Sequence, residues 1–125
     1  MPKTVQELAK EGQNGCCILP GSYHIDRPIQ IPAPAHGIYQ FECLPGAIFS
    51  LAPDTALFDL SLLSPGDFLE CGTLFLLPSA GCCFARENSS QAYVRALFAS
   101  APAGLDMTAF LGGAKAGRMA CKIAT

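Results

Sequence analysis

Hydrophobic residues near the start of the chain recur at the spacing of an α-helix. Those that share one helical face are Val5, Leu8 and Ala9. Thr4 and Glu7 form a capping-box pattern, in which each side chain can satisfy a backbone donor of the other residue. Gly12 is a natural stop for such a helix. The pattern therefore predicts one short amphipathic helix over residues 5–11, within a capping segment of helix and turn that covers residues 1–15.

Beyond this segment the period changes to two, which is typical of β-strands with one buried face. The positions expected to point inward are Tyr23, Ile25, Ile29, Ile31, Tyr39, Phe41, Cys43, Ala47, Phe49, Leu51, Phe58, Leu60, Leu62, Leu69 and Cys71. Arg27–Pro28 interrupts the first run, because proline donates no ladder hydrogen bond and favours extended geometry in the residue before it. Two short strands that meet at a bend are expected there. The apolar run Thr73–Leu77 is expected to be buried on both faces.

The spacing of turns indicates a repeat in the low twenties of residues. Pro-Gly occurs at Pro20–Gly21, Pro45–Gly46 and Pro65–Gly66, in steps of 25 and 20 residues. Gly-Cys-Cys followed by an apolar residue occurs at Gly15–Ile18 and at Gly81–Phe84, 66 residues apart, which equals three steps of 22. Several short strands per period of this size are typical of one coil of a β-solenoid. We therefore expect β-coils over residues 16–125, with a sandwich-like all-β domain as the alternative.

The final third of the chain shows weaker periodicity. Tyr93–Phe98 is expected to form one more strand pair, and Asp106 is expected to cap a short helix over Met107–Leu111. The tail beyond this helix shows no closing cap. We expect the part of the chain after about residue 100 to be irregular and the chain to be a piece of a larger protein.

The segment LPGSYHIDRPIQI, residues 19–31, carries a family resemblance. It resembles the first coil of right-handed parallel β-helix proteins of the pectate-lyase-like superfamily. The matching residues are Leu19, Pro20, Gly21, Tyr23, Ile25, Pro28, Ile29 and Ile31. The resemblance covers about residues 4–62 and implies an all-β fold, a right-handed single-stranded parallel β-helix with a short N-terminal capping helix. Because the superfamily includes lyases, hydrolases, phage tailspikes and adhesins, the resemblance implies no single activity.

Composition and charge argue against several classes of partner. Half of the residues are hydrophobic and only 14% are charged, which favours a folded domain over disorder. The net charge is −2 and no basic run occurs, so nucleic acid and anionic membranes are not expected as partners. No apolar stretch reaches the roughly 18 residues of a transmembrane helix. The polar segment MPKTVQELAKEG lacks a signal-peptide core, so a cytoplasmic or virion-associated location is expected.

The seven cysteines are expected to be reduced and to act mostly as small core hydrophobes. Cys16–Cys17 and Cys82–Cys83 are adjacent pairs, whose side chains point to opposite faces of a strand. Such a pair cannot offer two thiolates to one metal ion as a CxxC motif does, and no CxxC occurs. A disulfide framework is not expected without a secretory signal. We expect no metal site and no cofactor.

Outward polar residues of the first coils are the candidate contacts for a ligand. They are His24, Asp26, Arg27, Gln30, Gln40 and Glu42. His24 and Asp26 are expected to project from one strand face about 7 Å apart, where they can bind a sugar hydroxyl or, with Arg27, a carboxylate.

The acidic residues weighed as an acid and base pair are Asp26, Asp54, Asp59, Asp67 and Glu70. None forms an adjacent Asp-Asp pair, so they are expected to be solvated turn residues or strand-end caps, and no catalytic residue is assigned. Asn88–Ser90 fits the N-glycosylation pattern but is expected to mark a polar loop.

These features favour a non-catalytic β-helix module, structural or carbohydrate-binding, of a bacterial or phage surface or tail protein. The expected partner is an extended polysaccharide lying along the exposed sheet. A homo-oligomer and attachment to a larger chain stay open. The alternatives are a polysaccharide lyase or glycoside hydrolase acting on an extended glycan, and a non-solenoid all-β interaction domain.

Overall fold

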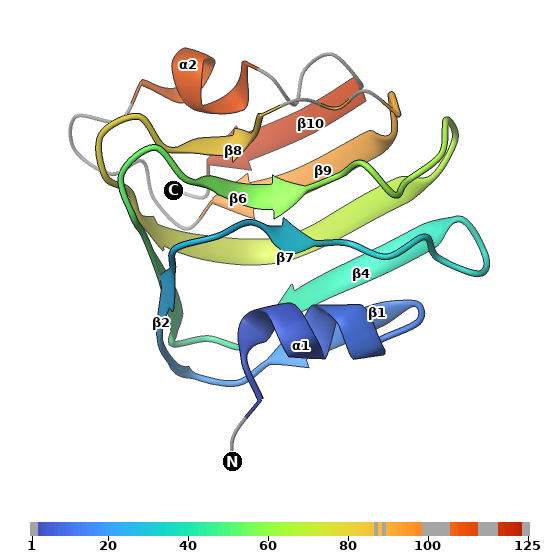
Figure 1. Ribbon diagram of the computed structural model, residues 1–125, viewed down its shortest axis with the longest axis horizontal. Helices are drawn as coiled ribbons and strands as arrows, with labels where there is room; N and C mark the ends of the chain where they lie inside the picture. The colour runs from blue at the N-terminus through green and yellow to red at the C-terminus, as the bar shows by residue number, and fades with distance from the viewer. Residues whose placement is uncertain (1–2, 87, 89, 99–105, 113–117, 124–125) are drawn as a thin grey trace.

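The computed structural model describes residues 3–86, 88, 90–98 and 106–112, together with the backbone of residues 118–123. The chain forms a parallel β-solenoid of about three turns, preceded by a short helix, α1 (Val5–Glu11). Its strands stack one above another from the N-terminal to the C-terminal end (Figure 1). The predicted all-β solenoid with an N-terminal helix is therefore confirmed.

Each coil contributes strands to three walls, which we call sheets A, B and C. Sheet A contains β1 (Gly15–Ile18), β4 (Ile38–Cys43), the first half of β7 (Phe68–Leu77), β9 (Tyr93–Phe98) and β10 (Arg118–Ile123). Sheet B contains β2 (Gly21–Ile25), β5 (Ala47–Leu51) and the second half of β7. Sheet C contains β3 (Ile29–Gln30), β6 (Ala56–Asp59) and β8 (Cys83–Ala85). The two short strands expected around Arg27–Pro28 are β2 and β3.

Residues that pair between successive coils of sheet A are 24 to 30 positions apart, more than the predicted low twenties. Gly15 pairs with Gln40, 25 positions later, whereas Tyr39 pairs with Leu69, 30 positions later. The corners between strands differ in length from coil to coil, so the chain has no constant period. The predicted period in the low twenties is therefore wrong, although the stacking of coils that it indicated is present.

Two of the three Pro-Gly turns occupy equivalent corners. β2 pairs with β5, and Gly46 lies against Pro20 of the coil below, where an added Cβ would come within 3.3 Å of the proline Cβ. Gly46 also has a φ of 94°, a conformation that favours glycine. Pro65–Gly66 instead precedes β7 on sheet A. The Gly-Cys-Cys recurrence is likewise no repeat, because its first copy lies in β1 of sheet A and its second leads into β8 of sheet C.

Aromatic rings form a continuous column of contacts through the solenoid core. The ring centroids of Phe41 and Phe58 are 5.0 Å apart, and those of Phe58 and Phe84 are 5.1 Å apart. Phe84 in turn contacts Phe98 and Phe110. The column connects sheet A with sheet C and continues through three coils.

Most of the positions predicted to face inward are buried. Those below 5% exposure are Ile25, Ile29, Ile31, Tyr39, Phe41, Ala47, Phe49, Leu51, Phe58, Leu60, Leu69 and Cys71. Leu62 is an exception, with 48% of its surface exposed. The expectation for Thr73–Leu77 was also wrong, because Phe75 and Leu77 are 39% and 51% exposed. The outward face of this part of β7 therefore meets solvent, whereas three successive residues of β6, Ala56, Leu57 and Phe58, are buried.

Helix α1 covers the N-terminal end of the solenoid (Figure 1). The Thr4 hydroxyl accepts a hydrogen bond from the Glu7 backbone N–H at 3.1 Å, as the capping pattern predicts. The Glu7 carboxylate bonds to the Thr4 hydroxyl instead of a backbone donor. The Tyr39 hydroxyl donates to the Ala9 carbonyl at 2.7 Å, which ties the helix to the second coil.

The region after residue 100, expected to be irregular, holds one helix and one strand. Helix α2 (Met107–Leu111) begins at the predicted cap, since the Asp106 carboxylate accepts from the backbone N–H groups of Thr108 and Ala109. It packs against β8 at the C-terminal end of sheet C. Strand β10 pairs along the whole of β9. The alternation of apolar residues at 119, 121 and 123 was the sequence signal for this strand.

Asn88 lies in the loop between β8 and β9, as expected, but it is fully buried. Its amide nitrogen donates to the Ala92 carbonyl at 2.8 Å, and its amide oxygen accepts from the Ala92 N–H at 3.2 Å and the Ser90 hydroxyl at 3.1 Å. The Ser90 hydroxyl also lies 3.2 Å from the Leu60 carbonyl of the coil below. An amide whose donor and acceptor are both bonded can be buried without an unsatisfied group. Asn88 therefore braces the turn that leads into β9.

The aromatic column predicts that Phe58→Ala lowers the free energy of unfolding by about 3–5 kcal/mol, because it removes a fully buried ring. The matched control is Phe75→Ala, which removes the same atoms from an outward-facing position and should cost about 1 kcal/mol. Equilibrium urea unfolding measures both. Equal losses in the two variants would contradict this account of the core.

The bracing role of Asn88 predicts that Asn88→Ala costs about 1–3 kcal/mol in the free energy of unfolding, because the two bonded backbone groups of Ala92 lose their partner. Asn14→Ala is the control, since exposed Asn14 loses one hydrogen bond, to the Ala35 N–H. Urea unfolding should show a clearly smaller loss for the control. A stability of Asn88→Ala equal to that of the unmodified chain would rule out the bracing role.

Candidate functional site

The six residues predicted to contact a ligand lie on three different walls of the solenoid. They are Gln40 and Glu42 on β4 of sheet A, His24 on β2 of sheet B with Asp26 and Arg27 just after it, and Gln30 on β3 of sheet C. Because the three walls face different directions, these side chains do not form one site. Each wall is considered separately below.

Gln30, on sheet C, is bonded to the neighbouring coil. Its side-chain nitrogen donates to the Asp59 carboxylate at 3.1 Å. Burial alone would raise the pKa of Asp59, but hydrogen bonds from the backbone and side chain of Ser61 and from Gln30 outweigh it and lower that pKa below its ordinary value. This pair connects the first coil with the second, which indicates a structural role.

His24, Asp26 and Arg27 do lie together, around a hollow of about 450 Å³ between β2 and the start of α1. Polar groups at this hollow are already bonded within the protein. The His24 ring nitrogen Nδ1 lies 3.1 Å from the Ser50 hydroxyl, and the Gln6 amide donates to the Arg27 carbonyl at 3.2 Å. Fewer groups are therefore left for a ligand than the sequence indicated.

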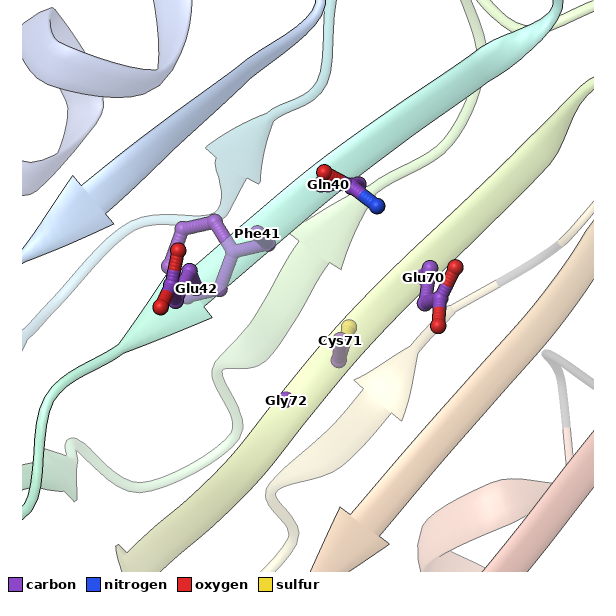
Figure 2. A pocket seen from close by; sticks show the side chains of 6 residues that line it. All are labelled: Gln40, Phe41, Glu42, Glu70, Cys71 and Gly72. Atoms are coloured by element: carbon purple, nitrogen blue, oxygen red, sulfur yellow. The ribbon is translucent and has the colours of Figure 1, made fainter.

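A second hollow, of about 160 Å³, lies on the outer face of sheet A between β4 and β7. Figure 2 shows Gln40 and Glu42 on β4 and Glu70 on the adjacent β7 around it, with Gly72 farther along β7. Gln40 and Glu70 are direct register partners. The hollow thus combines two residues of the predicted set with a third that the sequence placed only among the acidic candidates.

An irregularity in β7 lies beside this hollow. From Glu70 to Thr73, β7 holds one residue more than the stretch of β9 that it pairs with, residues 95–97. Such a bulge interrupts the hydrogen-bond ladder and bends the strand. The pairing of β4 with β7 stops one residue before Glu42. Gly72 brings no side chain into the resulting space.

A row of apolar side chains crosses the same face, two residues before the polar row of Gln40 and Glu70. Ile38, Phe68 and Tyr93 are register partners on three adjacent strands. The rings of Phe68 and Tyr93 stack at 5.9 Å between centroids with an interplanar angle of 12°. Ile38 is 49% exposed and Tyr93 37%. Polar and apolar rows therefore run side by side, about 6–7 Å apart along the strands.

The two carboxylates at the hollow have different electrostatic surroundings. Glu70 lies 3.8 Å from the guanidinium of Arg95, which is also 5.7 Å from the centre of the Phe68 ring. Glu42 forms no hydrogen bond or ion pair with any side chain that the structure describes. The hollow is therefore acidic on the β4 side and closer to neutral beside Arg95.

The described cysteines agree in part with the expectation of small core hydrophobes. Cys71 and Cys82 are buried, whereas Cys17 is exposed beside its register partner Glu42. Burial raises the pKa of the Cys71 thiol well above its ordinary value, and raises that of Cys43 to about 12. Within residues 3–98 and 106–112, apart from positions 87 and 89, no group of three or more His, Cys, Asp or Glu residues is placed to hold a metal ion. Cys121 lies outside the described side chains.

Most of the acidic residues weighed as catalysts are turn residues, as expected. The Asp67 carboxylate accepts from the Ser64 N–H at 2.7 Å, and the Asp59 carboxylate accepts from the Ser61 N–H at 2.9 Å. Asp54 lies in a turn with a φ of 59°. Glu70 is the exception, because it lies on the open face of sheet A.

The apolar row and the place of Gly72 at the hollow were not predicted from the sequence. Inward Tyr39 and Phe41 already implied that Ile38 and Gln40 point outward. Alternation gives no information about the register between strands. The partners of Ile38 and Gln40, 30 positions later in β7, were therefore not predicted. The bulge does have a sequence signal. Two residues, Gly72 and Thr73, separate the buried Cys71 and Leu74, where strict alternation would place only one.

Comparison with protein-family models, curated proteins and solved structures finds no match for this chain. Among the described residues, no helix is both long and apolar enough to cross a membrane.

The Asp59 contacts predict a change in stability with pH. A carboxyl group whose pKa is lowered on folding stabilises the fold above its unfolded pKa, and this stabilisation is lost as pH falls through the folded pKa. Asp59→Asn should therefore be less stable than the unmodified chain at pH 7, and the difference should shrink as pH falls below the ordinary value of 3.8. Urea unfolding at pH 7 and at a pH below 3.8 measures this difference in the free energy of unfolding. Exposed Asp26→Asn is the control, and an equal pH effect there would contradict the role of the Gln30 and Ser61 contacts.

Proposed function

We propose that this chain is a non-catalytic β-solenoid module that binds an extended polysaccharide on the outer face of sheet A. The observation that carries the proposal is the hollow of Gln40, Glu42 and Glu70 beside the apolar row of exposed Ile38, half-buried Phe68 and exposed Tyr93. Sugars present hydroxyl groups and apolar C–H surfaces together. A face with adjacent polar and apolar rows can contact both.

The geometry of the wall supports a long ligand over a compact one. Parallel strands place like rows of side chains across successive coils, about 4.8 Å apart. The hollow is open to solvent and shallow, which suits one sugar unit of a chain that continues in both directions. The resemblance of residues 4–62 to β-helix proteins is the reason to propose a bacterial or phage surface or tail protein as its setting.

A second candidate function is hydrolysis of the glycan at the same hollow. Two carboxylates, Glu42 and Glu70, occupy diagonal positions on adjacent strands, which corresponds to about 8 Å between their Cα atoms. Glycosidases use a pair of carboxyl groups that flank the bond to be cleaved, one of them as general acid. The measurement that separates the candidates is the appearance of new reducing ends when the chain is incubated with a bound polysaccharide.

Filling the hollow tests the proposed function. Gly72→Val should weaken binding at least tenfold, because a side chain at Gly72 would occupy the space of the sugar. The backbone tolerates the change, since an added Cβ meets no atom closer than the Cys43 nitrogen at 3.9 Å. Binding to a panel of neutral, amino and acidic polysaccharides is measured by affinity electrophoresis and calorimetry.

The matched control is Gln30→Ala on sheet C, which should bind as the unmodified chain does. Circular dichroism and urea unfolding show that each variant is folded. A panel in which no polysaccharide binds would reject the proposed function. Full binding by folded Gly72→Val would show that the hollow is not the site.

A further inference from the structure

We propose that the hollow over Gly72 receives the ammonium group of an amino sugar, so that the site prefers glycans with free amines and rejects uronates. This inference rests on the proposed function of the same site and specifies its ligand. Three properties of the hollow favour such a ligand: its acceptors, its net charge and the room above Gly72.

The acceptors around the hollow match an ammonium group. Such a group has three donors and no acceptor. Glu42 and Glu70 offer carboxylate oxygens, and the Gln40 amide adds a carbonyl oxygen. Hydrogen bonds between ionised partners are shorter and stronger than neutral ones. A hydroxyl group could use the same acceptors, but without the charge.

The net charge of the lining separates cationic from anionic ligands. Arg95 is the described cation beside the hollow, and it is engaged with Glu70 at 3.8 Å and lies over the Phe68 ring. Glu42 has no such counterion among the described side chains. A uronate carboxylate brought to this position would meet a like charge, which is a common way in which binding sites exclude wrong partners.

The space for the group lies where β4 and β7 separate. Pairing between the strands ends before Glu42, and the bulge with Gly72 leaves that carboxylate facing an unfilled gap. A Cβ at position 72 would reach within 3.9 Å of the Cys43 nitrogen, so the gap is about as wide as a small substituent. A charged substituent placed there lies between the two carboxylates.

The experiment compares three oligosaccharides of equal length by calorimetry at pH 6: β-1,4-linked glucosamine, its N-acetylated form and galacturonate. The glucosamine oligomer should bind about fivefold more tightly than the N-acetylated one, which corresponds to an exposed ion pair. Galacturonate should bind most weakly. The preference should decrease as salt is raised, because the carboxylates are near the surface.

Glu42→Gln is the test variant, since it keeps the shape and an acceptor but removes the charge. It should lose most of the preference for glucosamine and leave affinity for the N-acetylated oligomer within about twofold. Asp26→Asn is the control, because it removes one negative charge from a different wall. It should keep the preference.

The outcomes distinguish this inference from the proposed function. If the N-acetylated oligomer binds as tightly as glucosamine, or galacturonate binds equally well, the inference is overturned and the proposed function stands. If Asp26→Asn removes the preference as Glu42→Gln does, overall charge and not the hollow is responsible, which also overturns it. If no oligosaccharide binds, both are rejected.

Discussion

Parallel pairing between successive coils is the interaction on which the rest of this structure depends. It holds each strand in register with its neighbour above and below, so that inward side chains meet their counterparts instead of a chance neighbour. The stacked rings of Tyr23 and Phe49, whose centroids are 5.6 Å apart, follow from this register, because the two residues are partners on β2 and β5. A single coil leaves its aromatic rings and the backbone groups at its edges uncovered. The backbone ladder and the ring column therefore both require that coils stack on one another.

The same register organises the outer surface. It places Gln40 beside Glu70 and Ile38 beside Phe68, although 30 positions separate each pair along the chain. The candidate site arises where this regular order fails. At the bulge in β7 the ladder is interrupted, and a residue without a side chain occupies the gap. A regular wall would present continuous rows of side chains, whereas this local departure coincides with the recess lined by Gln40, Glu42 and Glu70.

Local features were predictable from sequence, whereas relations between coils were not. Thr4 and the spacing of Val5 and Ala9 sufficed for α1, since a helix end depends on a few neighbouring residues. Alternation likewise identified most of the core. The predicted coil length was wrong because corners of different length separate the strands. These corners are also the reason that the predicted ligand contacts lie on three walls. Asn88 was correctly placed in a loop, but its burial was not predicted, because it depends on one neighbour, Ala92, that satisfies both ends of its amide.

The burial of Asn88 has a consequence for producing the protein. Asn88–Ser90 is an acceptor sequence for N-linked glycosylation, and in a eukaryotic secretory pathway the transferase meets chains that have not yet folded. An oligosaccharide attached at that stage would occupy the amide nitrogen that donates to the Ala92 carbonyl, in a side chain with no exposed surface. A chain modified in this way could not close the turn into β9. Hosts that lack this modification are therefore the suitable source of folded material.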